Sequence, residues 1–325
     1  MKILVTGGAG FIGSNFIRYF LQKHSRYQVI NLDKLTYAGN LNNLIDVARN
    51  TRYRFVKGNI TNSKLVSSIM KKADAVIHFA AETHVDRSIQ DSDAFIQTNL
   101  VGTNVLLACA LKTRIQKFVH ISTDEVYGSI RKGYADESYP LLPSSPYSSS
   151  KAGSDLLALS YAKTYGLPVV ITRSSNNFGP YQYPEKVLPV FITNALMNLP
   201  IPIYADGSNV RDWLYVEDNC RAIDLAFHIG SAGEIYNVGG MQHMKNIDLA
   251  ERVLDIMGKS RKLISFVTDR PGHDYRYALN ISKISRKLKF KPSRNFDSDL
   301  EHTIRWYINN VPWWKKLRAR ELSTA

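Results

Sequence analysis

The chain has 325 residues, enough for one large domain or two smaller ones. Its hydrophobic content of 44% and charged content of 22% are ordinary for a soluble globular protein, and no apolar run approaches the roughly 20 residues that cross a bilayer. The formal net charge is +14, but the basic residues are spread along the chain, so we expect a solvated surface that attracts anionic small molecules, with neither nucleic acid nor a membrane as a partner.

Two further features narrow the class of protein. The N-terminus runs straight into "MKILVTGG", which is too short for the core of a signal peptide, so we expect a cytoplasmic location. Cys109 and Cys220 are too few for a disulfide framework or a zinc site, so we expect no metal centre and interpret both as small buried side chains.

Apolar, β-branched runs alternate with segments of helical periodicity through the first half of the chain. The runs are continuously apolar, as strands buried on both faces should be, and segments such as 104–112 between them have apolar positions at helical spacing. This βαβ series predicts an α/β fold with a Rossmann-type, doubly wound parallel sheet covered by helices. The predicted strands are 2–6, 28–32, 53–56, 75–79, 117–122 and 168–172.

After about residue 175 the pattern loosens, because Pro and Gly become more frequent and the elements shorten. We predict a nucleotide-binding domain over 1–175, with some later segments rejoining it, and a smaller C-terminal α/β lobe for substrate over 176–325. The later elements expected are a helix over about 216–228, a strand near 235–238, and helices near 246–257 and 297–310.

A glycine-rich turn follows the first predicted strand. The stretch "ILVTGGAGFIGS" places Gly7 at the tight turn, Gly10 where backbone approaches a pyrophosphate, and Gly13 where helix and strand pack closely. Asp33, at the end of the second strand, is placed to bind ribose hydroxyls, and its charge repels a 2′-phosphate. The turn therefore predicts bound NAD in preference to NADP; the alternative is a glycine-rich turn without a ligand.

The third and fourth predicted strands end in residues that suit the same ligand. Asn59 and Ile60 are placed to touch adenine, and the small side chains of Ala80 and Ala81 let a dinucleotide backbone pass.

Two carboxylates, Asp124 and Glu125, directly follow the fifth predicted strand in "ISTDEVYG". Adjacent carboxylates repel each other and lose solvation when buried, so this is a costly end for a strand. Strand C-termini line the ligand crevice in such sheets, which favours a chemical role. The alternative is that one of them caps the next element.

The stretch "SSPYSSSKAGSDLL" predicts the start of a helix, with Ser145 as its N-cap and Pro146 in its first turn. Tyr147 and Lys151 then lie four residues apart on one face. A neighbouring ammonium and a positive nicotinamide ring would favour the phenolate, so Tyr147 could take a hydroxyl proton while a hydride leaves the same carbon. Lys151 would also hold the nicotinamide ribose.

These motifs resemble the extended short-chain dehydrogenase/reductase superfamily. More narrowly, "DKLTYAGN", "AAETHVDRS", "STDEVYG", "PYSSSKAGSD", "SNNFGPYQYPEK", "NVRDWLYVED" and "DRPGHD" resemble the dTDP-glucose 4,6-dehydratase family, in order from residue 1 to about 314. Asn59 and Phe178 stand where that family usually has Asp and Tyr, and Thr83 stands where Ser is usual.

The resemblance implies an NAD-dependent hydro-lyase of deoxysugar (for example rhamnose-type) precursor biosynthesis. It would convert dTDP-glucose to dTDP-4-keto-6-deoxyglucose and water by C4 hydride transfer to bound NAD, C5 deprotonation with loss of the C6 hydroxyl, and hydride return to C6. Asp124 would be the acid and Glu125 the base, because close carboxylates push their pKa values apart. Thr123 would hold the C4 oxygen with Tyr147.

The resemblance also implies further binding residues, and a homodimer whose interface uses the apolar helices near 93–111 and 147–165. Further cofactor contacts would come from Phe11, Ile12, Lys34, Leu35, Thr36, Phe79, Thr98 and Asn177. The nucleotide sugar would be bound by Thr83, Thr123, Asn176, Glu185, Lys186, Val187, Pro202, Ile203, Tyr204, Arg211, Asn246, Arg270 and His273. Any single arginine among these has a surface ion pair as its alternative.

Other functions compete with this one. A UDP-glucose 4,6-dehydratase differs by one methyl group on the base, which the sequence leaves open. A sugar-nucleotide epimerase or decarboxylase keeps Tyr147 and Lys151 but needs no adjacent acid and base. A non-catalytic NAD-binding sensor typically loses the tyrosine or the lysine, and this chain keeps both.

Overall fold

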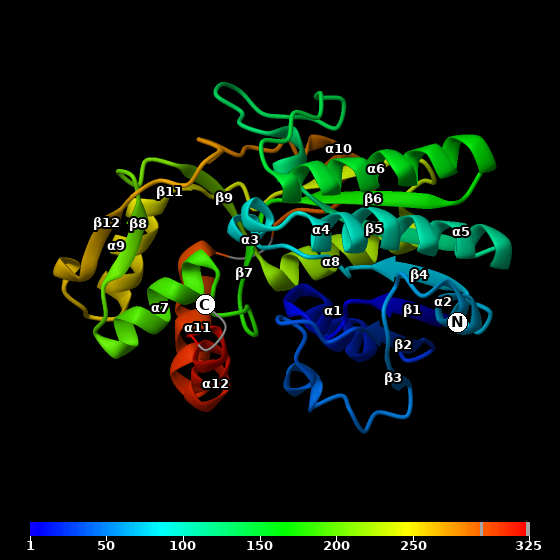
Figure 1. Cartoon of the computed structure of the whole chain (residues 1–325), viewed down its shortest axis with the longest axis horizontal. Helices are drawn as coiled ribbons and strands as arrows, with labels where there is room; N and C mark the ends of the chain where they lie inside the picture. Colours follow the sequence, from blue (N-terminus) through cyan, green and yellow to red (C-terminus); the bar gives the residue numbers. More distant parts are fainter. Residues whose placement is uncertain (293–294, 323–325) are drawn as a thin grey trace.

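A parallel sheet is the frame of the larger part of the molecule (Figure 1). The computed structural model describes residues 1–292 and 295–322, and within them this sheet has seven parallel strands in the order β10-β6-β5-β4-β1-β2-β3. The chain runs outward from β1 in both directions, so the predicted doubly wound topology is confirmed. The strands are β1 (Lys2–Thr6), β2 (Gln28–Asp33), β3 (Tyr53–Lys57), β4 (Ala75–His78), β5 (Lys117–Thr123), β6 (Val169–Ser174) and β10 (Ile235–Val238).

Helices cover both faces of this sheet. Helices α1 and α8 pack together on one face, whereas α5 lies between α2 and α6 on the other. The helices of this part are α1 (Phe11–Lys23), α2 (Ser63–Met70), α3 (Val85–Gln90), α4 (Asp93–Phe95), α5 (Thr103–Thr113), α6 (Pro146–Tyr165), α8 (Val216–Ile229) and α10 (Ser282–Leu288). Shorter helical segments are the 3-10 helices η1 (Leu41–Leu44) and η3 (Asp124–Tyr127) and the π-helix η2 (Ile96–Gly102).

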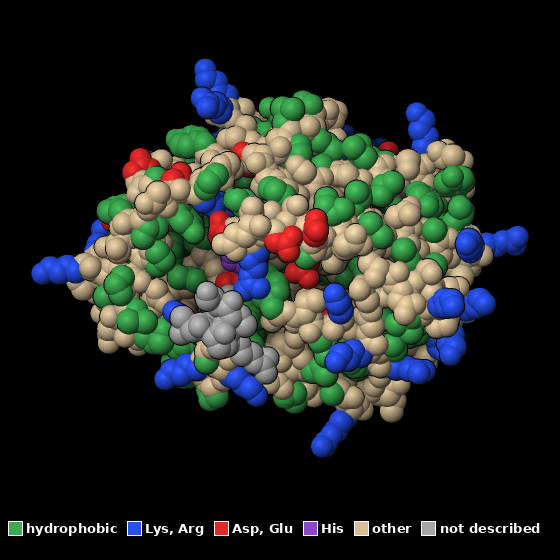
Figure 2. All heavy atoms as spheres, in the orientation of Figure 1, with side chains coloured by type: hydrophobic (Ala, Val, Ile, Leu, Met, Phe, Trp, Pro, Cys, Tyr) green, Lys and Arg blue, Asp and Glu red, His purple; other side chains and the backbone are tan. Residues whose placement is uncertain are grey.

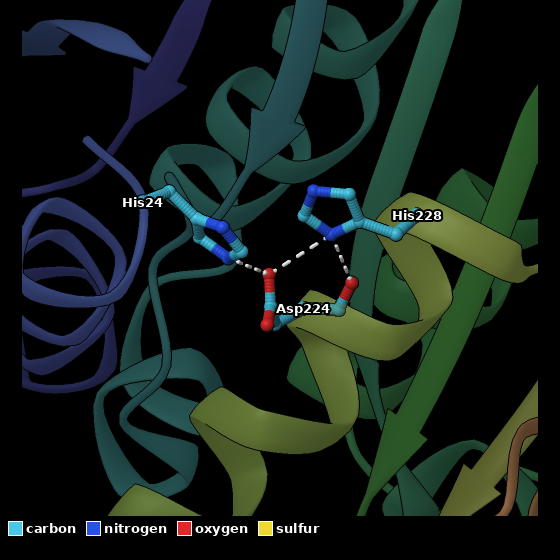
Figure 3. A group of neighbouring side chains, drawn as sticks. All are labelled: His24, Asp224 and His228. Carbon is cyan, nitrogen blue, oxygen red and sulfur yellow. Dashed lines mark hydrogen bonds and ion pairs between the residues drawn. The ribbon is translucent and has the colours of Figure 1, made fainter. Parts of the chain in front are cut away.

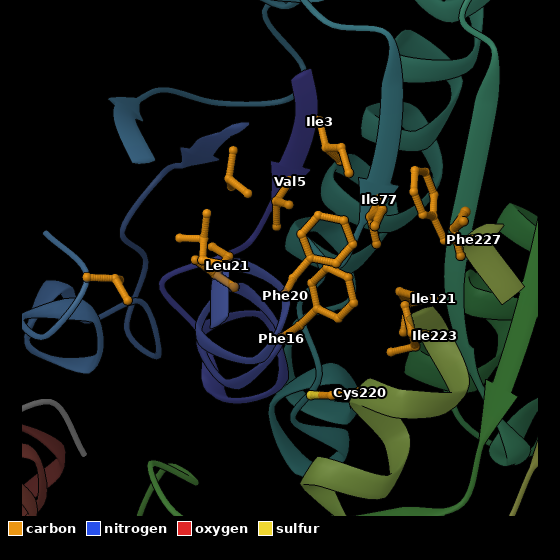
Figure 4. Close-up of a cluster of buried hydrophobic side chains, with 14 of the residues drawn as sticks. Ile3, Val5, Phe16, Phe20, Leu21, Ile77, Ile121, Cys220, Ile223 and Phe227 are labelled. Atoms are coloured by element: carbon orange, nitrogen blue, oxygen red, sulfur yellow. The ribbon is translucent and has the colours of Figure 1, made fainter. Parts of the chain in front are cut away.

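The core between α1, α8 and the sheet is built from large apolar side chains (Figure 4). Phe16 and Phe20, four residues apart on α1, stack with ring centroids 5.3 Å apart. Ile223 and Phe227 meet them from α8 at the same spacing. The apolar sides of both helices therefore pack on one face of the sheet. This packing fixes the start of α1, which directly follows the glycine turn.

A charged cluster also ties α8 to the C-terminal end of α1 (Figure 3). Asp224 lies 2.8 Å from His24 Nε2, 3.0 Å from His228 Nδ1 and 2.8 Å from Lys23 Nζ. Burial opposes ionisation, but these hydrogen bonds hold the pKa of the Asp224 carboxyl well below its usual range. The two imidazoles and the carboxylate are close enough to share a metal ion, but the lysine ammonium already binds this carboxylate. We interpret the cluster as an ion-pair clamp between the two helices.

A smaller lobe packs beside the end of the large sheet (Figure 1). Its core comes from α7, α9, α11 and two small sheets, and its first strand directly follows β6. One sheet has the order β11-β9-β7 and the other pairs β12 with β8. The elements are β7 (Asn176–Phe178), α7 (Val187–Met197), β8 (Ile201–Tyr204), β9 (Val210–Tyr215), β11 (His243–Lys245), α9 (Asn246–Ile256), the 3-10 helix η4 (Arg261–Leu263), β12 (Ile264–Val267), α11 (Phe296–Asn309) and α12 (Val311–Leu322).

Within residues 1–292 and 295–322, one continuous helical stretch, Asp93–Thr113, is long and apolar enough to cross a membrane by length and composition alone. Its second half is α5, which packs between α2 and α6 and buries Leu106, Leu107 and Ala110 in the core. A core helix of a folded domain meets the same length and composition test. Packing therefore accounts for the apolar character of the α5 half.

Candidate active site

A cavity of ≈ 300 Å³ lies at the carboxyl ends of the strands of the large sheet and extends to the first residues of the smaller lobe. This is the crevice where open α/β sheets bind ligands. Figure 2 shows acidic side chains gathered near the middle of one face with basic side chains beside them, whereas other lysines and arginines project around the rim. That dispersed rim agrees with the expectation of a solvated basic surface.

Most of the residues predicted for the site line this one cavity. The predicted cofactor residues on its wall are Gly7, Gly10, Phe11, Ile12, Gly13, Asp33, Lys34, Thr36, Asn59, Ile60, Phe79, Ala80, Ala81, Thr98 and Asn177. The predicted catalytic and substrate residues on its wall are Thr83, Thr123, Asp124, Glu125, Tyr147, Lys151, Asn176, Glu185 and Lys186. The predicted residues outside this wall are Leu35, Val187, Pro202, Ile203, Tyr204, Arg211, Asn246, Arg270 and His273.

The glycine turn has the close approaches that its sequence predicts. A Cβ on Gly7, whose φ is +71°, would lie 2.5 Å from the Ala80 backbone nitrogen. A Cβ on Gly13 would lie 2.4 Å from the Gly7 carbonyl oxygen, so helix α1 packs directly on the turn. The N-cap of α1 is Gly10, which offers no side chain to its amides. The amides at the start of α1 therefore remain available to bind an anionic group of a ligand.

Asp33 presents a buried carboxylate at the end of β2. Its two oxygens accept hydrogen bonds from the amides of Leu35 (2.8 Å) and Ala9 (2.9 Å). Burial raises the pKa of this carboxyl, and the two amide bonds oppose the rise. Leu35 thus contributes its amide to Asp33 instead of a side chain to the cavity wall. A fixed carboxylate with free lone pairs suits a ribose diol, so the residues here fit a dinucleotide.

Helix α6 begins as predicted. The Ser145 side chain accepts a hydrogen bond from the Ser148 amide, and Ser148 reciprocates to the Ser145 amide, which forms a capping box. Pro146 occupies the first turn. This cap fixes the start of the helix, and so the direction in which Tyr147 and Lys151 enter the cavity.

The electrostatics of Tyr147 differ from the sequence expectation. Burial, and after it the Glu125 carboxylate, raises the pKa of Tyr147 well above its usual value, and the hydrogen bond between Tyr147 and Thr123 works in the opposite direction. The Lys151 ammonium donates to the Ile121 carbonyl at 2.7 Å, and burial lowers the pKa of Lys151 to about 8. The groups of the protein therefore favour a neutral phenol.

Thr123, and neither carboxylate, caps the 3-10 helix η3. Its hydroxyl accepts from the Glu125 amide and donates to Asp124 Oδ1, both at 3.2 Å. The capping alternative for the carboxylate pair is therefore wrong, and both side chains are free to face the cavity. Asp124 is buried, and its Oδ2 has no hydrogen-bond partner among the described residues.

The surroundings of the two carboxylates are unequal. Burial and then the Glu125 charge raise the pKa of Asp124 well above its usual value. Burial also raises the pKa of Glu125, but three cations, Arg270, Arg211 and Lys186, oppose the rise. Of the two carboxyl groups, the structure therefore favours Asp124 as the one that holds the proton.

The predicted residues outside the cavity wall belong mainly to the smaller lobe. Arg211 is buried, donates to the Asp274 carbonyl at 2.9 Å and lies 4.3 Å over the Tyr277 ring. Arg270 Nε is buried with no partner among the described residues, although Nη1 lies 3.5 Å from Asp86 Oδ1. Both guanidinium groups oppose the rise in the pKa of Glu125, so the site extends from the cavity into the smaller lobe.

Three more of these residues surround the same region. The rings of Tyr204 and His273 meet edge to face, 5.8 Å apart. Asn246 begins helix α9, and its Oδ1 is buried without a partner in the described chain. Unsatisfied buried polar atoms are uncommon and indicate a ligand group or an ordered water.

Glu185 has a contact that the sequence did not predict. Tyr37 donates to it at 2.8 Å, and Arg87 lies 3.3 Å from it while covering the Tyr37 ring. This contact joins the loop after β2 to the smaller lobe at the edge of the cavity.

Several cavity residues were missed at the sequence level. Most of them lie at or just after a strand end, which is the signal that could have found them, because parallel strands bring their carboxyl ends to one edge. Glu82, for example, lies between the predicted Ala81 and Thr83. The missed residues include Leu32, Gly58, Glu82, Ile121, Ser122, Ser174, Ser175, Gln182 and Tyr183.

Comparison with known proteins agrees with this geometry. Residues 4–303 match the family model described as GDP-mannose 4,6 dehydratase. The chain is 49% identical to a dTDP-glucose 4,6-dehydratase of Streptomyces niveus over 328 residues, which covers 100% of this chain and 98% of that protein.

Solved structures show the same similarity. A dTDP-glucose 4,6-dehydratase from Streptomyces venezuelae with NAD and TYD bound has a TM-score of 0.96 and 49% identity, over 98% of this chain and 100% of that one. A UDP-glucuronic acid 4-epimerase from Bacillus cereus, in complex with UDP-glucuronic acid and NAD, has a TM-score of 0.90 and 31% identity, over 95% and 99%.

Proposed function

The chain belongs to the GDP-mannose 4,6-dehydratase family, and on that premise we propose that it is a dTDP-glucose 4,6-dehydratase. It is an NAD-dependent hydro-lyase, which converts dTDP-glucose to dTDP-4-keto-6-deoxyglucose and water. The full-length similarity to enzymes of that name supports the assignment, and the unequal pair Asp124–Glu125 is the observation that carries it.

NAD is the cofactor, and the crevice residues fit it. The amides at the start of α1 would bind the pyrophosphate, and Asp33 would bind ribose hydroxyls. Bound NAD supplies the hydride acceptor and donor of the reaction. Lys151, held by the Ile121 carbonyl, would bind the second ribose and keep a positive charge near Tyr147.

The oxidation at C4 needs a base for the hydroxyl proton, and Tyr147 is placed to serve as this base. Thr123, whose hydroxyl interacts with Tyr147, would hold the same oxygen. Since burial disfavours the phenolate, the proton leaves Tyr147 only when positive charge lies beside the ring.

The elimination needs one protonated and one ionised group at the start. Ionised Glu125 would remove the C5 proton, and protonated Asp124 would give its proton to the departing C6 hydroxyl. An epimerase or decarboxylase needs no such pair next to the sugar. The inequality of the two carboxylates therefore favours dehydration over these alternatives.

The smaller lobe would bind the nucleotide half of the substrate. Arg211 and Arg270 would bind the diphosphate, for which the planar guanidinium is suited. Tyr204, His273 and Asn246 would surround the base and its ribose. The unsatisfied atoms of Arg270 and Asn246 support this placement.

The test is to incubate the purified protein with dTDP-glucose and, separately, with UDP-glucose, without added NAD. We expect the 4-keto-6-deoxy product from dTDP-glucose, because NAD is carried with the protein and regenerated in each turnover. Product from UDP-glucose at an equal rate would replace the thymidine assignment, and no product from either would overturn the proposal.

The Tyr147→Phe variant tests the role of the Tyr147 hydroxyl in the same assay. The variant keeps the ring but lacks the hydroxyl, so it should retain bound NAD and lose nearly all turnover. Near-normal turnover would contradict the role of Tyr147.

We further propose a cytoplasmic homodimer with two functional lobes. Exposed apolar side chains, among them Ile96, Val101 and Leu156, lie on the helical stretch 93–113 and on α6 and support self-association through these helices. Residues 1–175 would bind NAD, and residues 176–325 would bind the nucleotide sugar. Three later elements, α8, β10 and α10, return to the large sheet. Residues 293–294 and 323–325 of the second lobe lie outside the described residues.

A further inference from the structure

A buried ion pair that is not part of the cavity wall lies beneath the catalytic residues. Arg173 on β6 is 2% exposed and Asp155 on α6 is 0% exposed, and Arg173 Nε donates to Asp155 Oδ2 at 2.8 Å. Neither residue lines the cavity. The reaction described above uses neither charge, so their burial calls for another explanation.

On one side, Asp155 connects the ion pair to the first catalytic segment, which is the part of α6 that bears Tyr147 and Lys151. Tyr147, Lys151 and Asp155 are each four residues apart on α6 and therefore share one face of the helix. His120 on β5 places its Nε2 3.2 Å from Asp155 Oδ1, and the next residue of β5 is Ile121, whose carbonyl binds Lys151. The carboxylate is thus fixed by two strands, and it fixes the helix that bears the tyrosine and the lysine.

On the other side, Arg173 contacts the second catalytic segment, which is the 3-10 helix η3 with Asp124 and Glu125. Arg173 Nη1 donates to the Tyr127 hydroxyl oxygen at 2.8 Å, and its Cζ lies 4.8 Å from the centre of the Tyr127 ring. Tyr127 in turn donates to Asn237 Oδ1 at 2.8 Å. Since Tyr127 belongs to η3, it shares a four-residue helix with Asp124 and Glu125.

Burying two charges costs free energy that their attraction repays only when the geometry is good, and apolar pairs of similar volume often stabilise a fold as well. A planar guanidinium, however, can bond two partners in fixed directions, which an apolar side chain cannot do. This difference points to geometry as the reason for the pair.

We propose that Arg173 is a positioning residue that fixes the two catalytic segments relative to each other. Through Asp155 it holds α6 with Tyr147 and Lys151, and through Tyr127 it holds η3 with the two carboxylates. The inference rests on the proposed function, because it assigns oxidation at C4 to the first segment and loss of water to the second.

The two arms can be cut separately. Tyr127→Phe removes the hydroxyl that joins Arg173 to η3 and leaves the ion pair intact. Asp155→Asn removes the charge that joins Arg173 to α6. We expect Tyr127→Phe to slow water loss about tenfold more than C4 oxidation, and Asp155→Asn to slow C4 oxidation at least tenfold. The measurements are single-turnover appearance of reduced nicotinamide, solvent-hydrogen exchange at C5, and bound NAD.

A third variant separates positioning from folding. Arg173→Met combined with Asp155→Leu replaces the ion pair by apolar side chains, and we expect a folded protein with bound NAD, a KM within about twofold of wild type and a kcat at least tenfold lower. The matched control is Arg252→Met with Asp297→Leu, an exposed ion pair between α9 and α11, which should leave kcat unchanged.

A wild-type kcat in the buried double variant would overturn the proposal. Equal slowing of both steps by Tyr127→Phe and Asp155→Asn would overturn it as well, because a merely structural role predicts that result. The proposed function is judged separately, by product formation in the wild-type protein, whereas the positioning role is judged by variant-to-wild-type ratios.

Discussion

At the scale of single residues, Asp124 and Glu125 show what adjacency in the sequence leaves open. Adjacency makes the two carboxylates repel each other, but it does not say which one keeps the proton. The fold makes them unequal, because three cations from distant segments oppose the rise in the pKa of Glu125. At Asp124, burial and two carboxylates raise the pKa, and Arg211 is the single cation that opposes the rise.

The asymmetry gives a prediction for two isosteric variants. Glu125→Gln should abolish solvent-hydrogen exchange at C5, because an amide cannot accept the proton. Asp124→Asn should slow water loss by about 100-fold while C4 oxidation stays near the wild-type rate, because general acid catalysis typically contributes that much. Exchange at C5 in Glu125→Gln would identify another base, and equal slowing of both steps in Asp124→Asn would exclude a dedicated acid.

At the scale of elements, the predictions that depended on local signals were confirmed. Helix α6 begins at Pro146 after Ser145, because capping is a contact among residues close in the chain. Strand β6 was predicted as 168–172 and ends at Ser174, two residues later, so Arg173 and Ser174 were outside the predicted strand. Strand β6 continues to Ser174 because it pairs with β5, which places Arg173 opposite Ser122. This pairing joins residues far apart in the chain, so the sequence near residue 173 does not indicate it.

The α6 cap can be tested alone. Ser145→Ala removes a hydrogen-bonded N-cap and should lower the free energy of unfolding by about 1 kcal/mol. For a chain of this size the melting temperature should then fall by about 2 °C. Ser160→Ala on the same helix, where the exposed hydroxyl only bonds the Leu157 carbonyl, is the control and should change the stability by less than about 0.5 kcal/mol. An equal loss in both variants would argue against the cap.

At the scale of the whole molecule, contacts between distant helices set the dependence of stability on pH. Asp224 holds Lys23, His24 and His228 at the junction of α1 and α8. The hydrogen bond to Asp224 raises the pKa of His228, and burial opposes this rise. The His228 contribution is therefore complete below its unfolded pKa of about 6.5 and is lost as pH rises through the folded pKa.

The carboxylate behaves in the opposite sense. Its folded pKa is depressed, so the Asp224 contribution is complete above its unfolded pKa of about 3.9 and is lost as pH falls through the folded value. Together the two groups stabilise the junction most between about pH 4 and about pH 6.5.

Asp224→Asn should therefore destabilise the protein more at about pH 6 than at about pH 9, by about 2 kcal/mol at the lower pH. Thermal unfolding at both pH values measures this. Asp46→Asn, at the exposed pair with Arg18, involves no histidine and should show no such difference. A loss for Asp224→Asn that does not change with pH would contradict the clamp.

The sequence alone determined the fold class, the glycine turn, the start of α6 and most of the cavity wall. The fold class, the turn and the helix start follow from local periodicity, from capping, and from the rule that parallel strands bring their carboxyl ends to one edge. Many of the wall residues, such as Thr98 and Lys186, were instead implied by the resemblance to a known family. Only the tertiary structure showed how the surroundings of Asp124 and Glu125 differ, how Arg211 and Arg270 come close to Glu125, and that Arg173 binds both Asp155 and Tyr127. Those properties depend on distances between residues far apart in the chain, which periodicity and spacing do not contain.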